Sequence, residues 1–293
     1  MENHSRDMDD FEVKRANIRH HDVEAELFEK VHPEGSSLYE RAKVLESLAF
    51  IARNSISYDV CVDVGCGTGF VTGFELPLYK MVIAVDISRR MLEVVRKRFG
   101  NFDSLNLIVC DAEFLPLKDE VADFVSVSSV LHHLPKPLNS LTNIARILKE
   151  GGLLYITREP NFQRLRRFSD FFDQVIVKKF VKLIQRLPVF RFELKPMSNI
   201  VVDGLDYATV DIHYPIGLRV AQLVEFLRSK SFEVIRAYSY HWIYPDSNVG
   251  LLQQLLTKSN FIIEKIPFSN KLGRYITIIA KKRNKRVKKT ILK

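Results

Sequence analysis

The chain has 293 residues, of which 46% are hydrophobic and 27% are charged. A chain of this length and composition can bury a sizeable core, which excludes a wholly disordered protein. No apolar run approaches the roughly 20 residues of a membrane-spanning helix, so we expect no integral membrane protein. Because residues 1–10 are polar and include acids, they do not resemble a secretory signal, and we predict a cytoplasmic protein.

The net charge of +9 comes from two segments. Residues 281–293 contain eight basic side chains and no acidic one, and residues 161–195 contain nine basic and three acidic side chains. The rest of the chain therefore has a net charge of −5. This distribution does not indicate a basic surface over the whole protein. The three cysteines, Cys61, Cys66 and Cys110, lack the paired spacing of a zinc site or a disulfide framework, so we predict that they are core residues.

Apolar periodicity predicts alternating helices and strands after a polar N-terminal segment. The first predicted element is a helix over residues 37–53, where leucine and alanine recur at helical spacing. The strands predicted after it are residues 60–64, 81–85, 105–110, 123–128 and 153–157. The helices predicted between and after them are residues 89–99, 138–148 and 217–230. Two further strands are predicted at residues 232–240 and 275–280.

This order predicts a doubly wound α/β sheet of seven strands. Alternating strands and helices give parallel strands joined by right-handed crossovers. Valine and isoleucine on both faces of the strands indicate that helices cover both sides of the sheet. We divide the chain into an N-terminal segment, a core, an insertion, the C-terminal part of the core and a basic tail, at residues 1–36, 37–160, 161–215, 216–282 and 283–293.

A glycine-rich turn follows the first predicted strand. Gly65, Gly67 and Gly69 form a G-x-G-x-G pattern, in which missing Cβ atoms allow a tight turn and a close approach to a ligand. The pattern alone is a weak signal. The next strand ends at Asp86, 21 residues past Gly65, where a carboxylate can accept hydrogen bonds from the hydroxyls of a ribose.

Two features distinguish a dinucleotide from another adenosine ligand. The glycine spacing is G-x-G-x-G and not G-x-G-x-x-G, and Asp63 lies two residues before the first glycine. A carboxylate there would repel a pyrophosphate but would attract the ammonium group of an amino acid. The pattern therefore favours an amino acid attached to adenosine.

With these blocks the chain resembles the class I S-adenosylmethionine-dependent methyltransferases, especially the small-molecule branch called type 11. The resemblance covers about residues 40–160 and resumes weakly over residues 217–282. It includes four further blocks, at residues 82–88, 110–117, 123–134 and 147–154. The family implies a Rossmann-like sheet with an antiparallel last strand, and S-adenosyl-L-methionine as the cofactor.

The resemblance also implies roles for individual residues. The turn from Gly65 to Gly69 would hold the methionine part of the cofactor with Asp63 near its ammonium group, Asp86 would hold the ribose, and Asp111 would accept from the adenine amino group. Taken singly, Asp63 and Asp111 fit capping or loop roles equally well, and Ser128 fits a packing role. The predicted cofactor-binding set is Asp63, Gly65, Cys66, Gly67, Gly69, Asp86, Ile87, Asp111, Ala112 and Ser128.

Methyl transfer from a sulfonium is an in-line displacement, so positioning can supply most of the acceleration and we expect no metal. A hydroxyl or acidic carbon as acceptor would need a base near the methyl group. The candidate residues are His132, His133, His213, Glu159 and Tyr214. Many members of the resembled family share a loop like that of His132 and His133, so a structural role is the alternative for these two.

The insertion, residues 161–215, contains seven of the twenty phenylalanines. Lys178, Lys182 and Arg186 recur on another face, so we predict a cationic amphipathic helix. A lid on the core is the simplest interpretation, and a lid that also contacts a membrane or admits a long apolar acceptor is the alternative. The basic tail would add attraction to anionic headgroups. The apolar stripe consists of Phe168, Phe171, Phe172, Val175, Ile176, Phe180, Ile184 and Leu187.

We therefore predict a methyltransferase that acts on a small-molecule or lipid-like acceptor, in the cytoplasm, with peripheral membrane contact as an open alternative. An RNA methyltransferase is the second hypothesis, supported by the basic tail. Against it, the chain has no recognisable RNA-binding module, and residues 128–131 read Ser-Ser-Val-Leu where amino-methylating nucleic-acid enzymes carry an Asn-Pro-Pro-Tyr-like block. A non-catalytic cofactor-binding protein is the third.

Overall fold

The structure is a computed structural model that describes most of the core of the chain. The described residues are 9–32, 37–162, 210, 217–241, 258–265, 271 and 273–284. The predicted amphipathic lid, the candidates His213 and Tyr214, and nearly all of the basic tail lie outside these residues.

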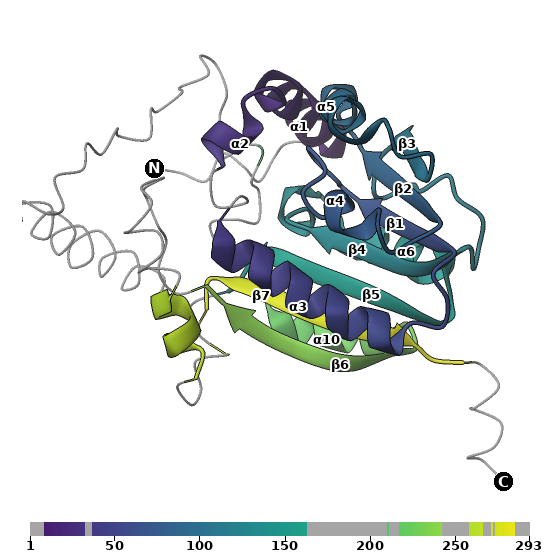
Figure 1. The fold of residues 1–293 in the computed structure, drawn as a ribbon, viewed down its shortest axis with the longest axis vertical. Coiled ribbons are helices and arrows are strands. Elements are labelled where there is room, and N and C mark those ends of the chain that lie inside the picture. The colour runs from purple at the N-terminus through teal and green to yellow at the C-terminus, as the bar shows by residue number, and fades with distance from the viewer. Residues whose placement is uncertain are drawn as a thin grey trace, which may run out of the picture.

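A seven-stranded sheet forms the centre of the protein, with the strand order β3-β2-β1-β4-β5-β7-β6 (Figure 1). The pairs among the first five strands are parallel, and β7 is antiparallel to both β5 and β6. The predicted doubly wound α/β sheet with an antiparallel last strand is therefore confirmed. The strands are β1 (Val60–Val64), β2 (Met81–Asp86), β3 (Leu105–Val109), β4 (Ala122–Ser128), β5 (Leu148–Pro160), β6 (Phe232–Tyr240) and β7 (Tyr275–Lys282).

Helices cover both faces of the sheet. The buried residues of α6 and α10 pack with one set of strand side chains, and those of α3 pack with the opposite set. Ser37 and Ser88 cap α3 and α5, because each side chain accepts a hydrogen bond from a backbone amide in the first turn. These helices are α3 (Leu38–Asn54), α4 (Thr72–Glu75), α5 (Arg89–Phe99), α6 (Pro137–Ile147) and α10 (Val220–Ser229), with a 3-10 turn η3 (Leu131–His133) before α6.

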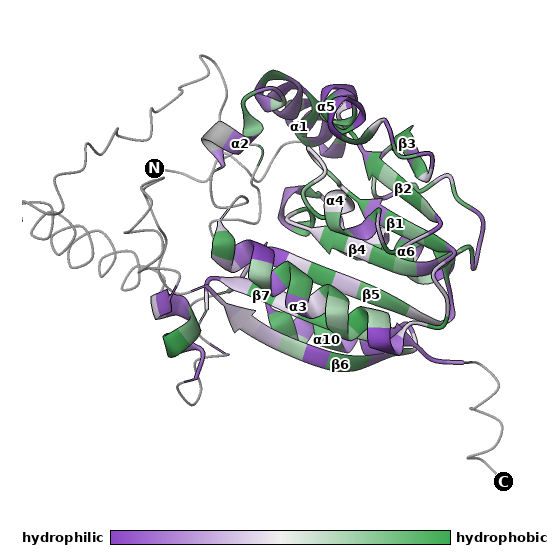
Figure 2. Ribbon diagram, in the orientation of Figure 1, coloured by the Kyte–Doolittle hydropathy of each residue, from purple (hydrophilic) through white to green (hydrophobic). Residues whose placement is uncertain are grey.

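Strand β1 shows why the sheet needs cover on both sides. Val62 and Val64 are buried on the face of α6 and α10, whereas Cys61 is buried on the face of α3. Figure 2 shows that the central strands are largely hydrophobic, as strands that are buried on both faces must be. Cys61 and Cys66 are buried and Cys110 is half-buried, and all three are free. The prediction that the cysteines are core residues therefore holds fully for two of them.

The fifth strand is longer than its apolar pattern predicts. The expected strand covered residues 153–157, but β5 runs from Leu148 to Pro160. It continues at its start because Leu148 pairs with Ala122 of β4, and at its end because Pro160 pairs with Tyr275 of β7. Neighbouring strands therefore fix its length.

In the part of the chain that the structure describes, no helix has the length and apolar character needed to cross a bilayer.

The polar N-terminal segment contains two helices that the sequence did not reveal, α1 (Asp10–Glu24) and α2 (Phe28–Val31). The buried residues of α1 recur at helical spacing, but most of them are polar: Val13, Ala16, Asn17, His20 and Glu24. Hydrophobic periodicity cannot detect such a face. Helix α1 lies beside α5 (Figure 1), near the edge of the sheet where β1 to β4 end.

Candidate active site

The glycine turn connects β1 to α4 and has a backbone that favours glycine. Gly65, Gly67 and Gly69 have positive φ angles of 68°, 53° and 84°. The amide of Gly65 donates to the carbonyl of Val85 at 2.7 Å, which joins the turn to the end of β2. A Cβ at Gly65 would lie 2.3 Å from Val130, whereas a Cβ at Gly67 would meet nothing within 4 Å. The middle of the turn thus faces open space, as a turn that receives a ligand must.

Asp86, the last residue of β2, stabilises this turn through hydrogen bonds. Its side chain accepts a 2.8 Å hydrogen bond from the amide of Gly67 and another of 2.8 Å from the amide of Ser88. Burial raises the pKa of Asp86 above its ordinary value, although the two amides act in the opposite direction. Each carboxylate oxygen keeps a second lone pair that can accept from a ligand hydroxyl.

Asp63 lies beneath the turn and is almost completely buried. Thr72 of α4 donates to it at 2.6 Å and Ser126 of β4 donates at 3.2 Å. Burial raises the pKa of Asp63 to about 6, although the two hydroxyls oppose this rise. The expected position near an ammonium group stays a prediction, since both oxygens already have partners from the protein.

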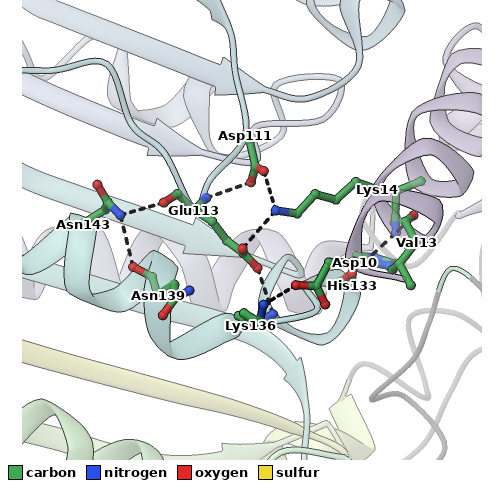
Figure 3. Close-up of polar contacts among 10 residues, drawn as sticks. Asp10, Val13, Lys14, Asp111, Glu113, His133, Lys136, Asn139 and Asn143 are labelled. Carbon is green, nitrogen blue, oxygen red and sulfur yellow. Dashed lines mark hydrogen bonds and ion pairs between the residues drawn. The ribbon is translucent and has the colours of Figure 1, made fainter. Parts of the chain in front are cut away.

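Asp111, after β3, is held by a lysine that the sequence did not single out (Figure 3). Lys14 of α1 lies 2.7 Å from Asp111 and 2.9 Å from Glu113. Burial opposes the charged form of Lys14, but the two carboxylates raise its pKa above the ordinary value. The amide of Glu113 donates to Asp111 at 2.8 Å, which fixes the turn that would face adenine. Ala112 between them is buried.

Polar contacts join helix α1 to three loops of the site. Ser88, at the start of α5, donates to Asp22 at 2.6 Å, and Asn17 donates to the carbonyl of His133 at 3.4 Å. Lys136 forms an ion pair with Asp10 (Figure 3). The helix therefore spans the loops that follow β2, β3 and β4. No local sequence pattern predicts these contacts, because their partners lie far apart in the chain.

A histidine and a glutamate meet at the ends of β4 and β5. His132 Nδ1 lies 2.9 Å from Glu159 Oε2. Glu159 also accepts from the amides of Val130, Leu131 and His132, at 2.7, 2.9 and 3.2 Å. Burial disfavours the charged form of Glu159, but these donors lower its pKa below the ordinary value. The carboxylate is therefore ionised and needs the proton on Nδ1 of His132, so Nε2 is the basic nitrogen of the neutral ring.

The remaining predicted residues lie around this pair. Ser128 ends β4, and its hydroxyl oxygen is enclosed without a hydrogen-bond partner among the described residues. The ring centroids of His132 and His133 are 3.9 Å apart. The Nδ1 atom of His133 lies 3.3 Å from the carbonyl oxygen of Val210. Val210 belongs to residues 161–215, so the insertion reaches this loop. Glu159 was expected after the fifth strand, but it lies within β5 and is fully buried.

The fold and these residues define a class of protein. A glycine turn after β1 and carboxylates after β2 and β3 lie at the carboxyl edge of an open sheet, where α/β proteins bind ligands. The order β3-β2-β1-β4-β5-β7-β6, with β7 antiparallel to its neighbours, is the sheet expected for a class I methyltransferase.

Comparisons with known proteins agree with this class. Residues 62–156 match the family model of the methyltransferase domain of type 11. A demethylmenaquinone methyltransferase of Clavibacter sepedonicus is 31% identical over 125 residues, which are 42% of this chain and 51% of that protein. A malonyl-[acyl-carrier protein] O-methyltransferase of Marinomonas is 36% identical over 96 residues, which are 32% of this chain and 36% of that protein. The chain thus spans about half or less of the length of these curated relatives.

Solved structures share the fold. A chain from the Haloferax volcanii complex of the Trm112 methyltransferase activator and a methyltransferase superposes with a TM-score of 0.56 and 16% identity, over 90% of this chain and 98% of that one. A Bacillus halodurans protein assigned to the methyltransferases gives 0.51 and 19%, over 83% and 98%. Residues 62–156 are thus the part of the chain that matches a methyltransferase domain of type 11, and this match implies S-adenosyl-L-methionine as the methyl donor cofactor.

Proposed function

We propose that this protein transfers the methyl group of S-adenosylmethionine to a small-molecule or lipid-like acceptor. The acceptor class follows the similar proteins, which are named for menaquinone, ubiquinone and malonyl-[acyl-carrier protein] methylation. The class is also compatible with the phenylalanine-rich insertion, residues 161–215.

The observation that carries the proposal is that Val130 joins the glycine turn to the His132–Glu159 pair. The side chain of Val130 packs against Gly65, and its amide donates to Glu159 at 2.7 Å. His132 follows two residues later. From this link through Val130 we place the His132 imidazole beside the turn that would hold the sulfonium. This is the arrangement that proton removal coupled to methyl transfer requires.

In the proposed complex the turn from Gly65 to Gly69 holds the methionine part. Asp86 binds the ribose, and Asp111 faces the adenine amino group. The cofactor supplies an electrophilic methyl group with a good leaving group. The protein supplies position and a proton acceptor.

We assign the role of base to His132, because its ring contacts the Glu159 carboxylate, which orients it, whereas the ring of His133 contacts the carbonyl of Val210. Glu159 acts as a positioning residue: it fixes the tautomer of His132 and holds the backbone of η3. It is not itself suited to accept the proton, since burial and four hydrogen bonds enclose its carboxylate.

The direct test is transfer of a labelled methyl group from S-adenosylmethionine, with the full-length protein and host extract. The extract is then separated into lipid, small-molecule and RNA fractions. Label in the lipid or small-molecule fraction supports the proposal. Label in RNA would instead favour an RNA methyltransferase, and cofactor binding without transfer to any fraction would favour a non-catalytic protein. The Gly67→Ala variant, with a methyl group in the proposed cofactor space, is the control that should show much less transfer when the cofactor is not saturating.

The role of His132 is tested by the pH dependence of the rate. His132→Ala should lower kcat by about 10²–10⁴-fold for an acceptor that must lose a proton, with cofactor affinity close to that of the wild type. A wild-type kcat in His132→Ala would refute the assignment. Glu159→Gln should shift the pH profile, because it removes the charge that stabilises protonated His132.

A further inference from the structure

Two histidines and a glutamate come together at the C-terminal end of α1. His20, His21 and Glu24 each offer a ligand atom, and these three atoms lie within 4.8 Å of one another. None of them belongs to the cofactor site described above. The cysteine spacing and the chemistry of methyl transfer predict no metal. Neither of them bears on a cluster of histidine and glutamate side chains.

The helix brings His20 and Glu24 to the same face. They are four residues apart, about one turn, so their side chains point in the same direction. His20 Nε2 lies 3.1 Å from Glu24 Oε2. Two ligands of a tetrahedral zinc ion with bonds of 2.0–2.1 Å are separated by about 3.3 Å. The observed spacing thus fits an ion between them after a small movement.

Glu24 also approaches a second helix. His32, directly after α2, has its Nε2 3.3 Å from the same oxygen of Glu24. Glu24 is almost completely buried, and the imidazoles of His20 and His32 contact its carboxylate. A buried carboxylate of this kind requires a compensating positive charge.

His21 distinguishes a metal ion from a simple ion pair. Its Nδ1 atom is enclosed and has no hydrogen-bond partner among the described residues. A neutral imidazole nitrogen is a common metal ligand, and a ring nitrogen of His21 is close enough to the ligand atoms of His20 and Glu24 to share one ion with them. A proton on His20 or His32 would neutralise Glu24 but would leave Nδ1 of His21 without a hydrogen-bond partner among the described residues, whereas a cation between the three side chains would engage all of them.

We propose that His20, His21 and Glu24 bind one divalent transition metal ion, with His32 as a neighbouring ligand or support. Two imidazoles and one carboxylate suit zinc, and also iron(II), cobalt(II) and nickel(II). The ion would link α1 to the segment after α2. It would also fix Lys14, earlier on the same helix, and Asp22, between His21 and Glu24, against the loops that would face the cofactor. Its role is therefore structural, outside the transfer step.

The test uses untagged full-length protein after chelator treatment. Titration with Zn²⁺ by calorimetry and with Co²⁺ by visible absorption should show one ion per chain. His20→Asn and Glu24→Gln should weaken binding of both ions at least about tenfold. The matched control is His241→Gln, which removes an imidazole that lies 2.6 Å from the carboxylate of Glu40 in another part of the core; it should leave the stoichiometry unchanged.

Circular dichroism establishes that each variant is folded. Where Glu24→Gln fails to fold, His21→Asn gives the same comparison at a side chain that is only partly buried. Folded wild-type protein that binds neither Zn²⁺ nor Co²⁺ would overturn the proposal. Wild-type affinity in the His20, His21 or Glu24 variants would overturn it as well, because the ion would then be bound elsewhere. These readouts do not depend on methyl transfer.

Discussion

Glu75, the last residue of α4, is a carboxyl group that the structure keeps in its neutral form. It is fully buried, and neither of its oxygens has a hydrogen-bond partner among the described residues. Burial raises the pKa of Glu75 well above its ordinary value of 4.5, and the nearby Asp63 raises it further. Ser126 and Cys61 oppose this rise only in part. We therefore expect Glu75 to be protonated in the folded protein at pH 7.

This proton makes stability depend on pH. The folded-state pKa is above the unfolded one, so the contribution of Glu75 is fully present below pH 4.5 and is lost as the pH rises toward the folded pKa. In that window the free energy of unfolding falls by about 1.4 kcal/mol per pH unit. Glu75→Gln keeps the size of the side chain but cannot ionise. Relative to the wild type, the variant should gain up to about 3 kcal/mol between pH 5.5 and 7.5.

Urea unfolding of both proteins at pH 5.5, 6.5 and 7.5 measures this difference. Asp63 also titrates in this range, and its contribution cancels as long as Glu75 is neutral in the folded wild type, because the uncharged glutamine side chain of Glu75→Gln is then electrically equivalent to it. Glu12→Gln, which replaces an exposed carboxyl group on α1, is the control and should give a difference that does not change with pH. A flat difference for Glu75→Gln would show that Glu75 is already ionised in the folded state and would refute the reasoning.

Four further predictions concern the cofactor edge. Gly67→Ala places a methyl group in open space at a φ of 53°, so it should cost about 1–2 kcal/mol of stability and weaken cofactor binding by about 1–3 kcal/mol in calorimetry; wild-type affinity would exclude the turn as the cofactor cradle. Gly65→Ala would meet Val130 at 2.3 Å and should therefore lower the thermal unfolding midpoint more than Gly67→Ala does. Asp86→Ala should weaken cofactor binding by about 1–3 kcal/mol through the loss of charged hydrogen bonds, and unchanged affinity would refute the ribose assignment. Lys14→Met leaves two carboxylates without their cation and should reduce stability in urea by about 1–3 kcal/mol; an unchanged midpoint would show that Lys14 does not anchor α1.

The core of the fold could be predicted because its pattern is local. The expected bounds of β1, α5 and β6 agree with the structure at both ends. In β1 the apolar residues end at a glycine-rich turn, and in α5 Ser88 marks the start through a side-chain cap. Strand β5 shows the limit of this approach, since its extra length depends on pairing with β4 and β7.

The candidate site could be predicted only in part, for the same reason. Gly65 and Asp86 follow apolar strands, so their position at one edge of the sheet follows from the alternation of strands and helices. Lys14 and its partner Glu113 are 99 residues apart, and no spacing rule connects them. The tautomer of His132 likewise depends on Glu159, which lies 27 residues away on another strand. Long-range polar contacts therefore account for what the sequence did not reveal.

Buried carboxylates show most clearly why residue type alone does not determine chemistry. Glu75 and Glu159 are both fully buried. Burial alone would neutralise both. Glu159 is ionised because three backbone amides and His132 donate to it. Ser126 and Cys61 offset the burial of Glu75 only in part, and neither oxygen of Glu75 has a hydrogen-bond partner among the described residues. The ionised carboxylate of Glu159 therefore lies beside the His132 imidazole that would accept a proton. Near Asp63, by contrast, Glu75 is neutral and adds no second negative charge.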